Sequence, residues 1–326
     1  MKKNIALVTG GYSGEAVISY KSAEAISKNI DTDLWNYYLV DIHPSGWFHI
    51  TASGEKITVD KNDFSVTING LKITFDAVLI SLHGTPGEDG KLQGYFDCLH
   101  IPYTSCDAAT SALTFNKRYT VAVAAFAGMH VAKSMHLFKS DAISADQIAQ
   151  QLSLPVFVKP NNGGSSIGMS KVTNAAHLEA AVEKAFKEDD QVLVEEFIKG
   201  REYTIGVFKT NGKIIALPIT EIISKNEFFD FEAKYEGASE EITPANVEEA
   251  VAEKVREAAR KAYLVFNCKG IVRIDFIYDE QNGYPYMLEI NTVPGQTSAS
   301  LVPQQVVAMG WTLKAFYSAL IEECFN

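Results

Sequence analysis

Short apolar runs alternate with a helical pattern in the N-terminal part of the chain. Residues 5–8 (IALV) and 77–80 (AVLI) are continuous apolar runs, which suit strands of a parallel sheet that is covered on both faces. Residues 16–30, which lie between these runs, carry apolar side chains at helical spacing. We therefore predict an α/β domain with a parallel sheet over residues 1–105.

The rest of the chain mixes helices and strands with polar connections. In chain order we predict the helices 108–127 and 175–187 and the strands 157–160, 192–194, 203–208, 214–218, 272–277 and 286–290. This order predicts two α+β domains, over residues 106–195 and 196–326.

One stretch of the third segment does not fit a regular element. Residues 224–243 are polar and rich in aromatic side chains, without clean periodicity, and such a stretch is long for an inactive loop in a compact domain. A helix is predicted to begin at Thr243 and Pro244, because Thr is a good N-cap and Pro a good first helical residue.

The C-terminal hairpin carries the most informative polar residues. Alternation places Arg273 and Asp275 on one face of its first strand, and Glu289 and Asn291 on one face of its second. If the hairpin connection is odd-numbered, or a β-bulge is present, Asp275 and Glu289 lie opposite each other at about 5 Å. Such a carboxylate pair with an amide oxygen suits Mg²⁺, although a solvated polar face is the alternative.

Two further segments have the composition of nucleotide contacts. Residues 159–168 (KPNNGGSSIG) place glycines and serines after Lys159, so that backbone N–H groups could meet phosphate oxygens. The stretch is neither a Walker A loop nor a GxGxxG motif, and a plain turn is the alternative. Residues 194–202 could supply backbone, apolar and acidic contacts to an adenosine, or could simply link two strands.

Loops after the two N-terminal strands are candidate ligand sites. Residues 10–15 (GGYSGE) follow the first strand, but the GxGxxG spacing of a dinucleotide loop is absent. His83 begins a loop at the carboxyl end of a parallel strand, where open α/β sheets bind ligands. His83 is therefore either a polar ligand contact or a hydrogen-bonded loop histidine.

Composition narrows the class of protein. The 326 residues are enough for two or three domains, and 47% apolar residues exclude dominant disorder. A net charge of −11 without a basic block argues against nucleic-acid binding. There is no apolar run of about 18 residues that could span a membrane. The four cysteines form no CxxC pair, so we expect a protein of the reducing cytoplasm.

Taken in order, these segments resemble the ATP-grasp ligases, and most closely the D-alanine–D-alanine ligase family. The matching stretches are residues 10–15, 83–90, 117, 159–168, 195–202, 229–235, 273–275 and 289–303. The last of them, EINTVPGQTSASLVP, is highly specific, and the resemblance covers nearly the whole chain. It implies an N-terminal parallel-sheet α/β domain followed by the two α+β domains of an ATP-grasp fold, with ATP held between the second and third domains.

The resemblance also implies where ATP and magnesium bind. Lys117 and Lys159 are implied to contact the nucleotide and its phosphates, and Lys234 the transferred phosphate. Adenine and ribose are implied to contact Glu195, Glu196, Phe197, Ile198 and Glu202. The implied ligands of Mg²⁺, or of Mn²⁺, are Asp275, Glu289 and Asn291.

A further set of residues is implied to handle the first amino acid. Glu15 would hold the amino group of the first D-alanine, and hydrogen bonds would tie it to Ser165 and Tyr235 and so close the site. His83 is counted with Glu15 among the residues that contact substrate. The stretch 224–243 is implied to be the lid over the reaction.

The second amino acid and the reaction follow from the same resemblance. Arg273 and the N–H of Gly295 would stabilise an oxyanion, and Ser300 would take the carboxylate of the second D-alanine. ATP would phosphorylate one D-alanine, and the amine of the other would displace phosphate to give D-alanyl-D-alanine for peptidoglycan synthesis. The family implies a cytoplasmic homodimer.

Three alternatives remain at this point. A ligase that forms D-alanyl-D-lactate or D-alanyl-D-serine would have the same fold, although Tyr235 argues against lactate because relatives specialised for lactate lack it. A nicotinamide-dependent dehydrogenase would use the first domain and release no phosphate. A non-catalytic nucleotide-binding protein would bind ATP without turnover, and the retained Arg273, Glu289, Asn291 and Ser300 argue against it.

Overall fold

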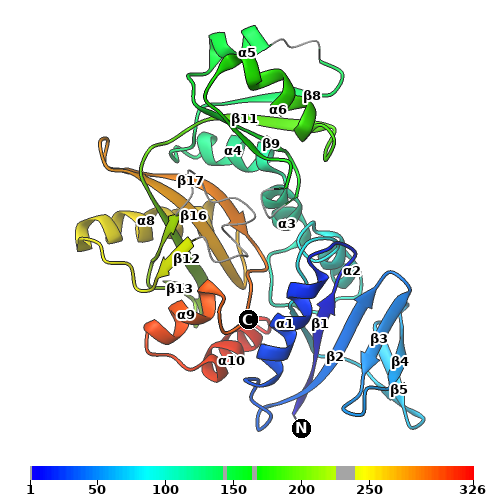
Figure 1. Cartoon of the computed structure of the whole chain (residues 1–326). Helices are drawn as coiled ribbons and strands as arrows, with labels where there is room; N and C mark the ends of the chain where they lie inside the picture. The colour runs from blue at the N-terminus through cyan, green and yellow to red at the C-terminus, as the bar shows by residue number, and fades with distance from the viewer. Residues whose placement is uncertain (1, 142–144, 164–166, 225–238) are drawn as a thin grey trace.

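The computed structural model describes residues 2–141, 145–163, 167–224 and 239–326. Within them the chain forms three β-sheets, one in each successive part of the sequence, with helices packed around them (Figure 1). In this described part, no helix combines the length and the apolar character that crossing a membrane requires.

The N-terminal sheet has seven strands in the order β6-β5-β4-β3-β2-β1-β7. These are β1 (Lys3–Gly10), β2 (Trp35–His43), β3 (Gly46–Ile50), β4 (Lys56–Asp60), β5 (Ser65–Ile68), β6 (Leu71–Ile73) and β7 (Ala77–Ile80). The predicted parallel pairing holds for β1 with β2 and with β7, and residues 5–8 are fully buried. The strands β3 to β6 extend the sheet in antiparallel pairs, which the sequence analysis did not predict.

Two helices accompany this sheet, α1 (Ala16–Ser27) and α2 (Lys91–Cys98). The helix predicted over 16–30 is therefore α1, which ends at Ser27 and not at residue 30.

The central sheet is antiparallel, in the order β10-β9-β11-β8. Its elements are β8 (Ser134–Phe138), α5 (Ala145–Gln151), β9 (Val156–Pro160), β10 (Ser170–Val172), the 3₁₀ helix η1 (Ala175–His177), α6 (Leu178–Ala185) and β11 (Gln191–Glu196). Val158 and Val194 are fully buried in a core that belongs to this unit alone.

The single helix predicted over 108–127 is wrong, because the chain forms two helices, α3 (Ala108–Phe115) and α4 (Lys117–Phe126). Asn116 between them is extended, and its side chain accepts a hydrogen bond from Tyr119 N–H (3.1 Å) as the N-cap of α4. Asn161 accepts from the two N–H groups between Asn116 and Tyr119. Lys117 N–H donates to its carbonyl (3.1 Å), and Arg118 N–H donates to its side-chain oxygen (2.8 Å). The break therefore points the start of α4 toward the end of β9.

The C-terminal sheet has six strands, in the order β15-β14-β12-β16-β17 with β13 paired to β12. Its elements are β12 (Arg201–Thr210), β13 (Lys213–Ala216), β14 (Thr220–Ser224), β15 (Ser239–Ile242), α8 (Glu249–Val265), β16 (Ile271–Asp279), β17 (Tyr284–Asn291), α9 (Leu301–Ala308) and α10 (Leu313–Glu323). The stretch 224–243 lies mostly outside the described residues, and its described ends are the paired strands β14 and β15.

The predicted helix start at Thr243 and Pro244 is wrong, because α8 begins at Glu249. Thr243 instead forms a hydroxyl–hydroxyl hydrogen bond with Thr220 (2.6 Å), and Ala245 N–H donates to the carbonyl of Ile219 (2.8 Å). Because this stretch is bound along the segment that leads into β14, it is not available to form a helical turn.

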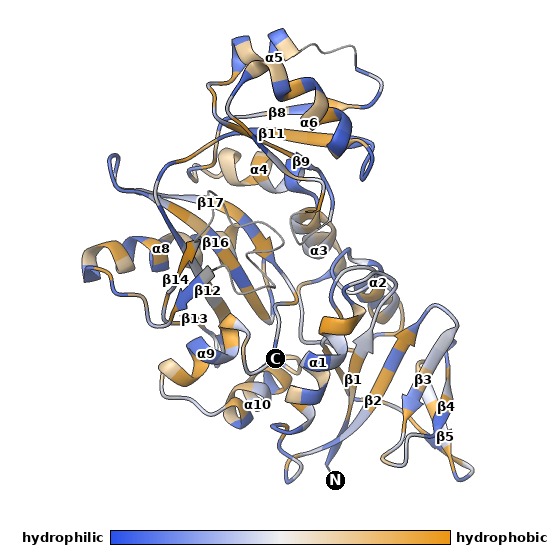
Figure 2. Ribbon diagram, viewed as in Figure 1, coloured by the Kyte–Doolittle hydropathy of each residue, from blue (hydrophilic) through white to orange (hydrophobic). Residues whose placement is uncertain are grey.

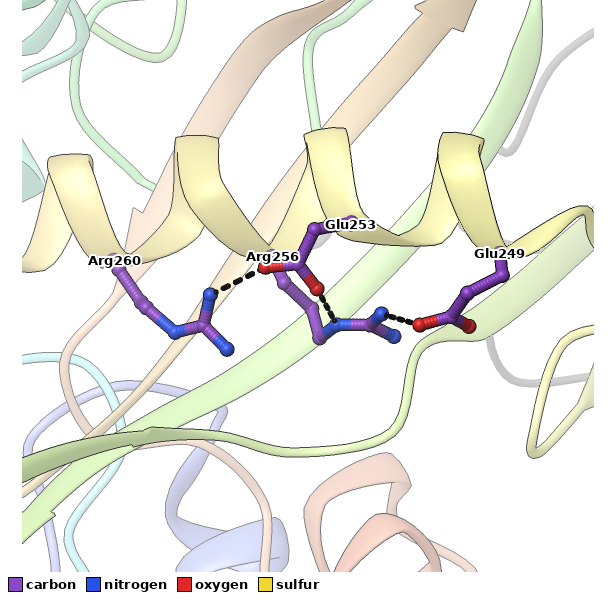
Figure 3. A network of polar contacts seen from close by, with 4 residues as sticks. All are labelled: Glu249, Glu253, Arg256 and Arg260. Atoms are coloured by element: carbon purple, nitrogen blue, oxygen red, sulfur yellow. Dashed lines mark hydrogen bonds and ion pairs between the residues drawn. The ribbon is translucent and has the colours of Figure 1, made fainter.

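Helix α8 carries a row of ion pairs between acidic and basic side chains (Figure 3). Arg256 pairs with Glu249 and, at 2.7 Å, with Glu253, which also accepts from Arg260 at 2.9 Å. The Glu249 side chain is 83% exposed and that of Arg256 only 19%. Ion pairs of this kind along a helix contribute about 0.5 kcal/mol each.

One hydrophobic core joins the first and third sheets. Ile5 and Leu7 of β1 and Ile26 of α1 belong to the same buried cluster as Phe316 and Leu320 of α10. This shared core fixes the N-terminal strands against the C-terminal helices, so residues from both ends of the chain face one cleft.

Gly270 marks a tight point of this junction and provides a test of it. Gly270 has φ +62°, and a Cβ there would collide with the carbonyl oxygen of Thr104. Gly212 has φ +73° with no atom near its Cβ position. We predict that Gly270→Ala lowers the free energy of unfolding by about 1–3 kcal/mol more than Gly212→Ala, because only Gly270→Ala adds a steric collision. Equal thermal midpoints for the two variants would contradict this packing.

Candidate active site

A cleft of about 870 Å³ opens between the three sheets. It is lined by all fifteen predicted site residues that the structure describes: Glu15, His83, Lys117, Lys159, Glu195, Glu196, Phe197, Ile198, Glu202, Arg273, Asp275, Glu289, Asn291, Gly295 and Ser300. The other three, Ser165, Lys234 and Tyr235, lie outside the described residues. The structure thus brings together residues far apart in sequence, while their individual roles stay predictions.

The acidic hairpin is formed by β16 and β17, where hydrophobic and polar residues alternate (Figure 2). Asp275 is the register partner of Glu289, and Arg273 is the partner of Asn291. A β-bulge follows Asp275, so the conditional prediction that a bulge would place the two carboxylates opposite each other is confirmed.

The Asp275 carboxylate accepts hydrogen bonds from three other side chains. Arg273 donates from Nε and Nη2 to its two oxygens, both at 2.9 Å, and Asn291 donates at 3.2 Å. Thr204 of β12 donates at 2.5 Å. Burial opposes the charge of Arg273, but Asp275 outweighs it and raises the pKa of Arg273 above its ordinary value. The sequence analysis missed Thr204, because only the register of β12 against β16 identifies it.

The hairpin has the donor set of a magnesium site. Two carboxylates and one amide oxygen are few protein ligands, which is usual where substrate phosphates and waters complete the coordination of Mg²⁺. Within the described ranges, no group of three or more His, Cys, Asp or Glu side chains could hold a metal by itself. Asp275, Glu289 and Asn291 therefore fit Mg²⁺ that is shared with a phosphate ligand.

Two lysines lie where phosphates are expected. Lys117, the first residue of α4, donates to the carbonyl of Gly163 (2.6 Å). Lys159 forms an ion pair with Glu195, and the two side chains are only 16% and 9% exposed. A lysine that is mostly buried beside an apolar strand needs such an anionic partner.

The part of the cleft that is expected to hold adenine follows β11. The carboxylate of Glu196 accepts from Ser153 N–H (2.7 Å), and Phe197 N–H donates to the carbonyl of Pro155 (2.9 Å). The ring centroids of Phe157 and Phe197 lie 6.0 Å apart. These contacts fix the strand end and leave an aromatic, apolar lining of the kind that binds a purine face.

The N-terminal loops place Glu15 beside the loop that begins at His83. Glu15 stands at the N-terminus of α1, and its carboxylate accepts from the Ser13 hydroxyl (3.2 Å). Gly84 has φ +66°, a backbone conformation that favours glycine, and a Cβ there would meet that carboxylate.

His83 is buried and Glu88 is half-buried, and both line the cleft. Burial lowers the pKa of His83 to about 4, so the ring is neutral near pH 7. Burial raises the pKa of Glu88 to about 8, and the charge of Glu15 adds to the rise. Gly84 N–H donates to Glu88 (2.6 Å), and the Ser22 hydroxyl lies 3.2 Å from His83 Nε2. His83 is thus a hydrogen-bonded loop histidine that also lines the cleft. Glu88 was missed as a site residue.

The segment after β17 carries Gly295 and Ser300, which both line the cleft. The Ser300 hydroxyl accepts from Thr297 N–H (3.0 Å) and lies 2.8 Å from the Thr297 hydroxyl. A Cβ on Gly295 would lie 2.8 Å from that same Ser300 oxygen. Ser300 is the N-cap residue of α9, and the first N–H groups of a helix favour a carboxylate ligand.

His83 gives a pH prediction. Its pKa lies near 4 in the folded protein against 6.5 ordinarily, so between these pH values the unfolded chain binds the proton that the folded chain excludes. Stability therefore falls as pH drops from 6.5 toward 4, by about 3 kcal/mol for this group. We predict that His83→Gln flattens this part of the unfolding-versus-pH curve. The exposed control His43→Gln should keep the wild-type slope, and equal slopes for both variants would refute the assignment.

Comparison with known proteins identifies the family. Residues 4–106 match the family described as D-ala D-ala ligase N-terminus, and residues 116–322 match D-ala D-ala ligase C-terminus. A D-alanine--D-alanine ligase of Flavobacterium johnsoniae is 47% identical over 320 residues, which cover 98% of each chain.

Solved structures agree. The VanG D-Ala:D-Ser ligase from Enterococcus faecalis superposes with a TM-score of 0.90 at 32% identity, over 99% of this chain and 100% of that one. The D-alanine--D-alanine ligase of Bacillus anthracis complexed with ATP superposes with a TM-score of 0.78 at 27% identity, over 99% of this chain and 97% of that one. The predicted ATP-grasp fold class is confirmed. The chain belongs to the D-alanine–D-alanine ligase family.

Proposed function

We propose that this protein joins two D-alanine molecules to D-alanyl-D-alanine, with hydrolysis of ATP to ADP and phosphate, for peptidoglycan synthesis. The observation that carries the proposal is the convergence, in one cleft, of a carboxylate pair, two lysines, an arginine and a serine at a helix N-terminus. The 47% identical relative named for this reaction supports the choice of D-alanine. A dehydrogenase has no support from any of these observations.

ATP would occupy the part of the cleft between the central and C-terminal sheets. Lys117 and Lys159 would contact its phosphates, Glu195 to Ile198 its adenine, and Glu202 its ribose. The relative complexed with ATP supports nucleotide binding by this fold. When bound by Asp275, Glu289 and Asn291, Mg²⁺ or Mn²⁺ would neutralise charge on the phosphates. Lys234, outside the described residues, is proposed for the transferred phosphate.

The first D-alanine would bind at the N-terminal loops. The Glu15 carboxylate would hold its ammonium group, and the proposed link from Glu15 to Ser165 and Tyr235 would close this side. Glu88, with its pKa raised to about 8 by burial, stays protonated near pH 7. A neutral Glu88 therefore adds no second negative charge beside the proposed ammonium site.

The chemistry then needs two displacements. The carboxylate of the first D-alanine attacks the terminal phosphorus of ATP, which forms an acyl phosphate and releases ADP. The free amine of the second D-alanine attacks the acyl carbon, and phosphate leaves with its bonding electrons. Arg273 and Gly295 N–H would stabilise the oxyanion of the tetrahedral intermediate. Ser300 and the first turn of α9 would hold the second carboxylate.

A second candidate is a ligase that adds D-serine in place of the second D-alanine. The structure with a TM-score of 0.90 is a D-Ala:D-Ser ligase, which keeps this candidate open. For either function, we propose that the protein is a homodimer and acts in the cytoplasm.

The first test of the function is phosphate release with ATP and Mg²⁺ across a panel of D- and L-amino acids and D-lactate. We predict that phosphate is released when D-alanine is the only amino acid present. Mass spectrometry should identify the product as D-alanyl-D-alanine. A preference for D-alanyl-D-serine in the mixture would establish the second candidate. ATP binding without release for any panel member would leave only a nucleotide-binding role.

The second test concerns the hairpin. We predict that Glu289→Gln lowers kcat at least about 100-fold and raises the Mg²⁺ concentration needed for half-maximal rate, because one anionic ligand becomes neutral. Glu257→Gln, on the exposed face of α8, is the matched control and should keep wild-type values. Near-normal turnover of Glu289→Gln at saturating metal would remove Glu289 from the metal site.

A further inference from the structure

The segment from Thr292 to Ser300 is neither helix nor strand, although it carries Gly295 and Ser300. Such a segment holds functional groups accurately only if other parts of the molecule fix its backbone. Val293 and Gln296 within it are buried, so their fixing contacts lie inside the protein.

Ser22 of α1 supplies one of these contacts from the other end of the chain. Its side chain is fully buried, and its hydroxyl oxygen accepts from Gln296 N–H at 3.1 Å. The same oxygen lies 3.2 Å from His83 Nε2.

The other side of the segment is fixed as well. The Gln296 side chain accepts from the buried Tyr317 hydroxyl (3.2 Å) and donates to the carbonyl of Pro294 (3.0 Å). His83 and Glu88 both interact with the backbone of Val293. The residues before and after Gly295 are therefore held by groups from the N-terminal loops and from α10.

Helix α1 connects these contacts with the first-substrate side of the cleft. Glu15 stands at its N-terminus, and Ser19 and Ser22, three positions apart, lie on one face of it. Ser19 accepts from His83 N–H at 2.9 Å. One rigid helix thus carries the proposed ligand of the first amino acid and also fixes the segment proposed to bind the second.

We propose that Ser22 is a positioning residue for the second amino acid, acting through Gln296 on Gly295 and Ser300. This inference rests on the proposed ligase function. Without the hydroxyl, Gln296 N–H is buried with no acceptor at this position, and the segment shifts to find another. Such a shift moves the groups proposed to bind the second D-alanine. It therefore lowers affinity far more than the loss of one buried oxygen atom would by its volume alone.

The test is steady-state kinetics of Ser22→Ala with D-alanine varied over a range that resolves the two D-alanine KM values. We expect the KM for the second D-alanine to rise at least about tenfold, with a lower kcat, while the KM for ATP and for the first D-alanine change less than about twofold. Ser22→Thr, which keeps a hydroxyl, should recover most of the second-site affinity.

Two further variants separate positioning from general destabilisation. Ser27→Ala on the same helix removes a hydroxyl that, among the described residues, donates to the carbonyl of Ala23, and should keep all three KM values. Tyr317→Phe removes only the hydroxyl that bonds Gln296, and should raise the second D-alanine KM selectively by a smaller factor. Parallel changes in all three KM values, or none, in both Ser22→Ala and Tyr317→Phe would overturn the inference. Lack of dipeptide formation by the wild type would instead refute the ligase function itself.

Discussion

The β-bulge after Asp275 decides which side chains of the C-terminal hairpin meet across the two strands. Side chains alternate along a strand, so a shift of one residue in register would pair Asp275 with a residue of the opposite face. With the bulge, Asp275 faces Glu289 while the next pairs resume with apolar residues inward. Because of this one inserted residue, apolar side chains on both sides of the bulge stay on the buried face, while the two carboxylates lie together on the other face.

Arg273 makes this carboxylate pair tolerable in the absence of a ligand. Its guanidinium group lies two residues from Asp275 on the same strand and bonds both carboxylate oxygens. The arginine therefore supplies positive charge beside acids that would otherwise repel each other. Thr204 adds a neutral donor from the neighbouring strand, which orients Asp275 without changing the net charge.

The shared core of the first and third sheets gives the site its second half. Ile5, Ile26 and Phe316 pack in one cluster, so α1 and the segment that leads to α9 have a fixed relation. Glu15, at the start of α1, and Ser300, at the start of α9, thereby face the same cleft from opposite ends of the sequence. The central sheet has its own core, and its contribution to the cleft comes from the ends of β9 and β11.

Sequence patterns predicted those parts of the fold in which one local signal decides the structure. The apolar runs at 5–8 and 77–80 are the buried parallel strands, and the alternating pattern around Asp275 is the hairpin. The break at Asn116 and the late start of α8 escaped prediction, because Asn161 and Ile219, distant in sequence, provide the bonds that override local helix preference. Thr204, Glu88 and Ser22 escaped for the same reason, since each gains its role from a partner that only the tertiary structure brings near.

The most direct measurement of the central claim is a crystal structure with Mg²⁺ and a non-hydrolysable ATP analogue. The account predicts an ion with one oxygen each of Asp275 and Glu289 at about 2.1 Å, bridging to the phosphates, with the purine beside Phe197. A nucleotide bound elsewhere, or an ordered nucleotide in the cleft with both carboxylates turned away from any ion, would contradict it.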